Sequence, residues 1–398
     1  MALAVAGRSV FLKRYDFDQA STSFPKAPGV GEAMADYINH VGVNVGRGTY
    51  GAAEDAALTV LGVRERLARL FHFCQRPGQV IFTPGATWGL NLILKGYLKP
   101  GDLVLISGME HNAVMRPLRQ LEKQGVRVAR IPTDVTGSAR MEAVPALLDA
   151  SPSLVLVNHA SNVSGTLFPL EEIAALCRQR GIPLAVDAAQ TAGHLPIDFQ
   201  ALGLAALCVP GHKGLRGPQG IGAVLMEESF AQRVQPLITG GTGSHSDREE
   251  QPDYLPDRFE SGTLNLPGIF GMRPALDWLL SRDIKALRQL EIKRTARLLE
   301  GLKNAGPRIA GPANPQRQVG VVSLDFSPDL DNALAADRLE RDFGVLTRCG
   351  LHCAPSAHRV LGTFPQGTVR LSIGPETGEE EIDWAVEAVR KTAEAGPC

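Results

Sequence analysis

Lys213 is the residue whose surroundings first suggest chemistry. It follows a short apolar run at residues 204–209 and lies in a loop between Gly211 and Gly214. Burial at the end of a strand would lower the pKa of the amine and free it for Schiff-base chemistry. A lysine after a strand is more often a surface residue, so this interpretation depends on the rest of the chain.

Three further features are suited to a cofactor that carries a ring and a phosphate. The small-residue turn at 83–89 opens a helix, where free backbone N–H groups and the helix dipole bind a phosphate. Asp187 ends an apolar run, and its carboxylate could keep a pyridine nitrogen protonated, which turns the ring into an electron sink. His111 follows another run, where an imidazole could lie flat against a ring. Each also has a plain structural explanation, such as an Asp that caps the next helix.

The elements that must position these residues are short apolar runs that alternate with helical patterns. This alternation predicts an α/β fold with a mostly parallel sheet of seven strands and helices on both faces. Ligands of such sheets bind at the carboxyl ends of the strands. The predicted strands are 80–82, 103–107, 126–131, 154–158, 184–187, 205–209 and 221–226. The polar residues at their ends are the turn at 83–87, His111, Asn162, Asp187 with Gln190, and His212 with Lys213.

Past Gly241 the chain becomes polar and then helical, and its C-terminal part predicts a smaller α+β domain. We expect a large cofactor-binding domain at 16–265 and a small domain at 266–398, joined by the N-terminal residues 1–15.

Composition limits the function further. The 398 residues include 41 basic and 42 acidic side chains, so no global charge favours nucleic acid or a membrane surface. No apolar stretch is long enough to span a bilayer and the N-terminus lacks a basic start, which predicts a cytoplasmic enzyme acting on a small molecule. Six scattered cysteines do not indicate a disulfide framework.

Taken together, these motifs resemble the class V branch of the fold-type I pyridoxal-phosphate enzymes, in particular the cysteine desulfurase and selenocysteine lyase family. The resemblance runs from Tyr15 to the segment around Arg370, nearly the whole chain. Its motifs are Met109-Glu-His-Asn-Ala113, Ser161-Asn-Val-Ser-Gly-Thr166, Val186-Asp-Ala-Ala-Gln190, Gly211-His-Lys213, Phe259-Glu-Ser-Gly-Thr263 and Leu351-His-Cys-Ala-Pro355. It implies an aspartate-aminotransferase-like large domain.

The resemblance also implies that pyridoxal 5'-phosphate is the cofactor and that Lys213 binds it covalently and later moves protons. The ring would be held by Asp187 at its nitrogen, Gln190 near its hydroxyl, His111 stacked on its face and Asn162 beside it and the substrate. The phosphate would lie on Ala86 and Thr87 with His212 nearby. Thr263 would reach the cofactor phosphate of a neighbouring subunit, which implies a homodimer.

The implied reaction transfers sulfur from L-cysteine, or selenium from selenocysteine, to Cys353 and leaves alanine. Arg370 would grip the substrate carboxylate, since a guanidinium suits bidentate binding, and Tyr50 would lie near the substrate. The sulfur would then pass to an acceptor protein. A second thiol, Cys349, could exchange sulfur or form a disulfide with Cys353, and no metal site is expected.

Three positions depart from the better-known desulfurases. Pro210 and Ala86 lack hydroxyls that commonly contact the phosphate, and Tyr50 stands where many relatives have a histidine. These changes leave the lysine chemistry intact but weaken any preference for free cysteine. Two alternatives therefore stay open. The first is another class V reaction, such as transamination, epimerisation or C–S lysis, in which Cys353 is not a nucleophile. The second is a non-catalytic protein that serves as a sulfur carrier or scaffold.

Overall fold

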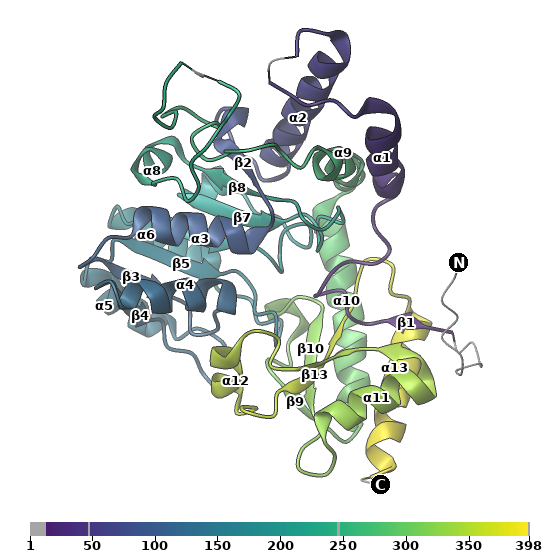
Figure 1. The fold of residues 1–398 in the computed structure, drawn as a ribbon. Coiled ribbons are helices and arrows are strands. Elements are labelled where there is room, and N and C mark those ends of the chain that lie inside the picture. Colours follow the sequence, from purple (N-terminus) through teal and green to yellow (C-terminus); the bar gives the residue numbers. More distant parts are fainter. Residues whose placement is uncertain (1–12, 47, 245–246, 397–398) are drawn as a thin grey trace.

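A computed structural model describes residues 13–46, 48–244 and 247–396, and Figure 1 shows their arrangement. A large sheet with its helices occupies one part of the molecule, and a smaller sheet with its own helices lies beside it. The N-terminal segment expected to join the small domain is described only from Lys13, and Cys398 lies outside the described residues.

The large sheet has seven strands in the order β2-β8-β7-β6-β5-β3-β4. Only β8 is antiparallel to its neighbours, so the other six strands run in one direction and end at one edge. The predicted α/β class with a mostly parallel seven-stranded sheet is therefore confirmed. The strands are β2 (Val80–Thr83), β3 (Leu103–Ile106), β4 (Arg127–Arg130), β5 (Leu154–Asn158), β6 (Leu184–Asp187), β7 (Ala206–Pro210) and β8 (Gly222–Met226).

Alternate side chains along these strands enter two separate cores, one on each face of the sheet. One core packs against α2 (Gly51–Leu70), α5 (Val144–Asp149), α6 (Leu170–Gln179), α7 (Phe199–Leu202) and α9 (Leu266–Leu280). The other packs against α3 (Ala86–Tyr97), α4 (Asn112–Glu122) and α8 (Glu228–Arg233). The central strands are buried on both faces, which explains why they are apolar without alternation.

The small sheet is antiparallel, in the order β12-β13-β10-β9. Val369 and Leu371 of β13 enter a core with three helices, whereas Arg370 between them points to the opposite face. That alternation directs a guanidinium toward the large domain. The strands are β9 (Arg308–Ala310), β10 (Val321–Asp325), β12 (Arg348–Gly350) and β13 (Thr368–Ser372), and the helices are α10 (Ile284–Leu302), α11 (Asn332–Phe343) and α13 (Glu379–Glu394), with α12 (Pro355–Leu361) beside the large domain.

The N-terminal strand β1 (Tyr15–Asp16) pairs in parallel with β11 (Val345–Leu346) of the C-terminal part. Helix α1 (Val30–Asp36), which continues as a π-helical turn at Tyr37–Val41, and α2 both pack on α9. Helix α9 thus shares the core of the large sheet, although it follows the predicted division at residue 265. The exact division between the domains stays a prediction. None of the helices in the described ranges is long and apolar enough to cross a bilayer.

Candidate active site

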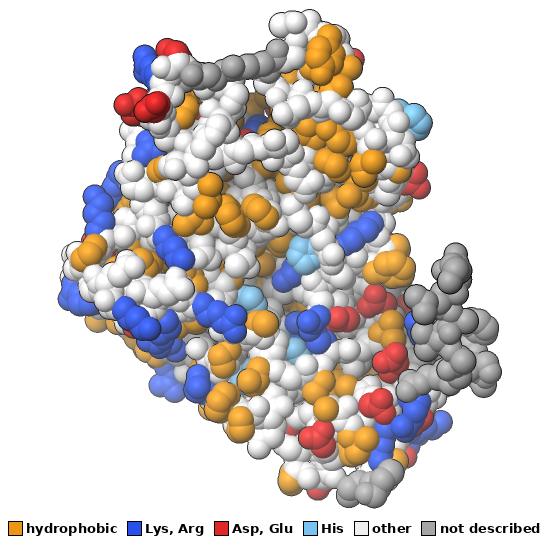
Figure 2. Space-filling view, in the orientation of Figure 1, with side chains coloured by type: hydrophobic (Ala, Val, Ile, Leu, Met, Phe, Trp, Pro, Cys, Tyr) orange, Lys and Arg blue, Asp and Glu red, His pale blue; other side chains and the backbone are white. Residues whose placement is uncertain are grey.

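A cavity of about 700 Å³ lies at the carboxyl ends of the large sheet's parallel strands. Figure 2 shows histidine and basic side chains near the centre of the face drawn, between the two parts of the molecule. The structure brings eight of the predicted site residues to the cavity wall: Ala86, Thr87, His111, Asn162, Asp187, Gln190, His212 and Lys213.

Lys213 enters the cavity from the loop after β7. Burial lowers the pKa of its amine to about 8, and the carboxylate of Asp187 partly opposes this shift. The loop packs tightly: a Cβ on Gly214 would clash with the carbonyl oxygen of Ala192. Glycine beside the lysine therefore allows the close approach that holds the amine at this edge of the sheet.

Asp187 is the last residue of β6 and is almost fully buried. Its Oδ1 accepts a hydrogen bond of 2.9 Å from the backbone N–H of Ala189. Burial raises the pKa of the carboxyl group, while the Ala189 N–H and the amine of Lys213 oppose the rise. A cation placed in the cavity would offset the cost of burying this carboxylate.

His111 caps the N-terminus of α4, where its Nδ1 accepts a hydrogen bond of 3.0 Å from the N–H of Ala113. Burial lowers its pKa to about 4, and the positive charge of Lys213 adds to the effect. The ring is therefore neutral at pH 7 and carries its hydrogen on Nε2. A neutral ring fixed at Nδ1 can present its flat face to the cavity.

The N-terminus of α3 forms another part of the wall, with Ala86 and Thr87 in its first turn. No side chain caps this helix, so its first N–H groups can bind an anion. A Cβ on Gly222 of β8 would lie 2.9 Å from the Cα of Gly85, so glycine is needed for the turn to lie on the sheet. Nearby, the buried Nδ1 of His212 has no partner among the described residues, and burial lowers its pKa to about 4.

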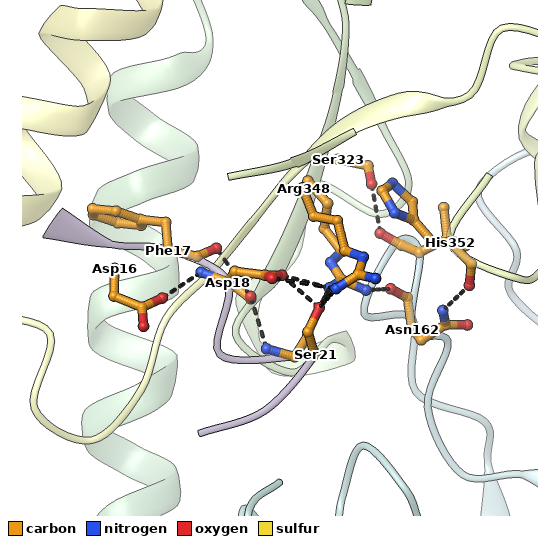
Figure 3. A network of polar contacts seen from close by, with 12 residues as sticks. Asp16, Phe17, Asp18, Ser21, Asn162, Ser323, Arg348 and His352 are labelled. Atoms are coloured by element: carbon orange, nitrogen blue, oxygen red, sulfur yellow. Dashed lines mark hydrogen bonds and ion pairs between the residues drawn. The ribbon is translucent and has the colours of Figure 1, made fainter. Parts of the chain in front are cut away.

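Arg370 reaches the site through Asn162, whose carbonyl oxygen accepts a hydrogen bond of 3.0 Å from Nη1. Its Nη2 donates to Asp18 Oδ1 at 2.8 Å and to Ser21 Oγ at 2.7 Å. Figure 3 shows Arg348 pointing toward the same two residues, and its Nη1 lies 2.7 Å from Ser21 Oγ. Two guanidinium groups therefore converge on one carboxylate at the edge of the small sheet.

Asn162 connects the cavity to the loop between β12 and α12, which carries His352 and Cys353. Its Nδ2 donates a hydrogen bond of 2.7 Å to the carbonyl of His352, while its buried Oδ1 has no partner among the described residues. An unpaired buried amide oxygen is costly unless something donates to it.

Cys353 is exposed, in the loop between β12 and α12. Both Cys353 and His352 have positive φ angles, 56° and 46°, which is uncommon for residues other than glycine and stores strain at functional sites. The carbonyl of Cys353 accepts a hydrogen bond of 2.8 Å from the N–H of Asn112, which fixes the loop to the start of α4. Cys353 also lies within electrostatic reach of Arg370.

Cys349 does not share this environment. It pairs with Val369 across β12 and β13, whereas its neighbour Arg348 pairs with Arg370. Successive residues point to opposite faces, so Cys349 faces α11 and the Asp331 carboxylate rather than the cavity. The expected sulfur exchange or disulfide between Cys349 and Cys353 stays a prediction, and in this conformation the two thiols lie in different surroundings. The part of the chain that the structure describes contains no group of three or more His, Cys, Asp or Glu placed to hold a metal ion.

Two predicted site residues lie away from this chain's own cavity. The side chain of Tyr50 is 54% exposed at the start of α2, and Thr263 is exposed after the polar segment. The prediction for Thr263 concerns a neighbouring subunit and stays a prediction, as does the role of Tyr50.

Asp18, Ser21, Glu110 and Asn158 were not predicted as site residues. Asp18 and Arg370 are 352 residues apart, and no local pattern reports such a pair. Glu110 could have been noticed, because a charged residue directly before His111 follows an apolar strand and must be buried or turned to solvent.

Comparisons with known proteins agree with this architecture. The family model for class-V aminotransferases matches residues 14–384. A probable cysteine desulfurase of Methanothermobacter thermautotrophicus is 30% identical over 95% of this chain and 94% of its own, and the cysteine desulfurase of Escherichia coli K12 is 30% identical over 94% and 92%. The apo structure of a cysteine desulfurase from Thermococcus onnurineus superposes with a TM-score of 0.89 at 28% identity, covering 96% of this chain and 95% of that one.

Proposed function

The chain belongs to the class-V aminotransferase family, and we propose that it is a pyridoxal-phosphate-dependent cysteine desulfurase. It removes sulfur from L-cysteine, or selenium from selenocysteine, and leaves alanine and a persulfide on Cys353. One observation carries the proposal: Lys213 and Asp187 meet in a cavity next to which an exposed cysteine is held in a strained loop near Arg370.

The cavity residues fit the cofactor. The uncapped N-terminus of α3 and the unpaired Nδ1 of His212 suit a phosphate, although Ala86 and Pro210 supply no hydroxyl there. The buried Asp187 suits the protonated ring nitrogen, and Lys213 suits the covalent attachment. When bound, pyridoxal phosphate supplies an electron sink for negative charge at the α-carbon of an attached amino acid.

The protein side chains then divide the remaining work. Lys213, with its lowered pKa, takes the α-proton of the substrate and returns a proton later, because a neutral amine is the competent base. The neutral ring of His111 would stack on the bound cofactor ring, and Gln190, whose Nε2 donates a hydrogen bond of 3.2 Å to the carbonyl of Ala20, would hold the ring hydroxyl. Arg370, held by Asp18, positions the substrate carboxylate beside Asn162.

Cys353 performs the sulfur transfer. Its thiolate attacks the substrate sulfur, an S–S bond forms, and the carbon–sulfur bond breaks with its electron pair left on carbon. The carbon takes up a proton and becomes the methyl group of alanine, so the carbon is reduced while the two sulfurs become a persulfide. No external oxidant is needed. The backbone carbonyl of Cys353 accepts a hydrogen bond from the N–H of Asn112, so the side chain of Cys353, and not its backbone, moves toward the substrate.

We further propose a cytoplasmic homodimer in which Thr263 of one subunit contacts the cofactor phosphate of the other. The exposed positions of Thr263 and Tyr50 support this arrangement, because neither serves its own cavity. The exposed thiol of Cys353 is suited to an acceptor protein that must collect the sulfur. A domain division at 16–265 and 266–398, completed by the N-terminal residues, forms part of the same proposal.

The test is a product assay with cysteine, selenocysteine and related amino acids, combined with mass measurement of the intact chain. We expect alanine in the solution and one added sulfur on Cys353. Cys353→Ala should lose both, whereas Cys349→Ala, on the other face of the sheet, should keep both. Keto-acid products, or cysteine turnover by Cys353→Ala as fast as by the wild type, would overturn the proposal.

A further inference from the structure

A second acidic side chain, Glu110, lies behind the cavity wall and has no role in the steps above. It immediately precedes His111, in the turn between β3 and α4, and none of its surface is exposed. Its Oε1 accepts hydrogen bonds from the backbone N–H groups of Asn158 at 3.0 Å and Ser107 at 3.2 Å and lies 2.6 Å from Ser107 Oγ, while its Oε2 has no partner among the described residues.

The hydrogen bonds around Ser107 identify the protonation state of Glu110. Ser107 Oγ lies 2.6 Å from Glu110 Oε1 and 2.7 Å from Asn158 Oδ1, yet a hydroxyl has one hydrogen. Asn158 Nδ2 donates to the carbonyl of Met109 at 3.0 Å, so Asn158 Oδ1 must accept from Ser107. The hydrogen between Ser107 and Glu110 must then come from Glu110.

Turning the Asn158 amide around does not remove this requirement. Its Nδ2 would then donate to Ser107 Oγ, but its Oδ1 would lie 3.0 Å from the carbonyl oxygen of Met109 with no hydrogen between them. If Glu110 were ionised, one oxygen–oxygen contact would lack a hydrogen in either orientation. An ionised carboxylate would also leave Oε2 buried and unpaired, which is far more costly for a charge than for a neutral acid.

We infer that Glu110 is kept as the neutral carboxylic acid and is a positioning residue for the cofactor site. Its proton completes a chain that runs from Glu110 through Ser107 to Asn158 and the carbonyl of Met109. Asn158 lines the cavity and is the register partner of Asp187 across β5 and β6. The chain thus holds the strand beside Asp187 in place without adding a second negative charge to the site.

The charges facing Glu110 agree with this assignment. Burial raises its pKa to about 8 and the carboxylate of Asp187 on β6 adds to the rise, while the hydrogen bonds with the Ser107 side chain and with the backbone N–H groups of Ser107 and Asn158 oppose it. Arg130 on β4 is the cation with which Glu110 interacts, and Ser107 and Asn158 are its other polar neighbours. Above pH 8 the acid should ionise and bring a negative charge next to Asp187, which weakens binding of an anionic cofactor.

An infrared difference spectrum of the full-length chain tests the protonation directly. The wild type minus Glu110→Gln should show the carbonyl band of a carboxylic acid at pH 6, and this band should vanish above pH 9. Glu122→Gln in α4, which removes a carboxylate paired with Arg119 at the surface, is the matched control and should show no such band. A carboxylate band for Glu110 at pH 6 would overturn the inference.

Cofactor affinity provides a second readout. The ratio of the pyridoxal-phosphate dissociation constants of the wild type and Glu110→Gln should rise up to about tenfold per pH unit above pH 8, because only the wild type can ionise. Because both proteins contain Lys213, the effect of its titration on cofactor binding divides out of this ratio. A ratio that does not change between pH 7 and 9 would also overturn the inference. The positioning role rests on the proposed cofactor site, whereas the infrared result does not depend on it, so the two can fail separately.

Discussion

The pKa of Lys213 is the property on which the proposed chemistry most depends, and its causes can be tested one charge at a time. Burial lowers it to about 8, the carboxylates of Asp187 and Asp18 raise it, and the guanidinium groups of Arg370 and Arg348 lower it. At pH 7, about one amine in eleven is then neutral, compared with about one in three thousand for an ordinary lysine. The difference is roughly 300-fold, or ~3.4 kcal/mol.

The assay is the rate at which the cofactor-free chain captures pyridoxal phosphate, followed by absorbance across pH 6–11. The wild-type rate should have a midpoint near pH 8. Arg348→Gln should raise the midpoint because it removes a positive neighbour, and Asp18→Asn should lower it because it removes a negative one. Opposite shifts from two partners of one ion pair would be difficult to explain by a general loss of structure.

Arg308→Gln is the matched control. Arg308 belongs to the same small sheet and pairs with Asp325, its side chain is 51% exposed against 53% for Arg348, and it is not among the charges acting on Lys213. Its midpoint should equal that of the wild type. A wild-type midpoint above pH 10, or shifts of the same sign in Arg348→Gln and Asp18→Asn, would refute the electrostatic account of the lysine.

Three further predictions concern stability, each measured by urea or thermal unfolding. The contribution of Glu110 to the free energy of unfolding, measured as the wild type minus Glu110→Gln, should fall by up to roughly 5 kcal/mol as the pH rises from 4.5 to 8, because native Glu110 keeps a proton that the unfolded chain loses. Gly89→Ala should cost ~1–3 kcal/mol, since the added Cβ clashes with Val224 where α3 lies on β8. Arg64→Met should cost ~3–5 kcal/mol because it leaves Glu260 buried without its cation, and adding Glu260→Gln should recover part of the loss.

The parts of this molecule that could be predicted from sequence are those that local patterns encode. The strand before Lys213 and the strand that ends at Asp187 are both apolar because they are buried on both faces of the sheet. The direction of β8 could not be predicted, because an antiparallel central strand has the same apolar pattern as a parallel one. The contact of Asp18 with Arg370 was equally inaccessible, since it depends on how β1 and the small sheet are placed in space.

Cys349 shows how little sequence spacing says about the surroundings of a side chain. It lies four positions before Cys353 in the sequence, a spacing that suggests sulfur exchange or a disulfide between the two thiols. In the fold, β12 ends between them, and the strand turns Cys349 toward the core side while the strained loop turns Cys353 outward. Spacing predicts proximity on a helix, but across the end of a strand it does not.

The balance of charge connects the separate observations about the site. Among the described residues, the carboxylates that act on Lys213, beside the guanidinium groups of Arg348 and Arg370, are those of Asp18 and Asp187. With Glu110 neutral, the site keeps a surplus of positive charge for the two anionic groups of the proposed function, the cofactor phosphate at the start of α3 and the substrate carboxylate at Arg370. An ionised Glu110 would cancel that surplus from behind the wall, where no solvent screens it. A neutral acid in this place therefore keeps the strands aligned while leaving the attraction for both anions intact.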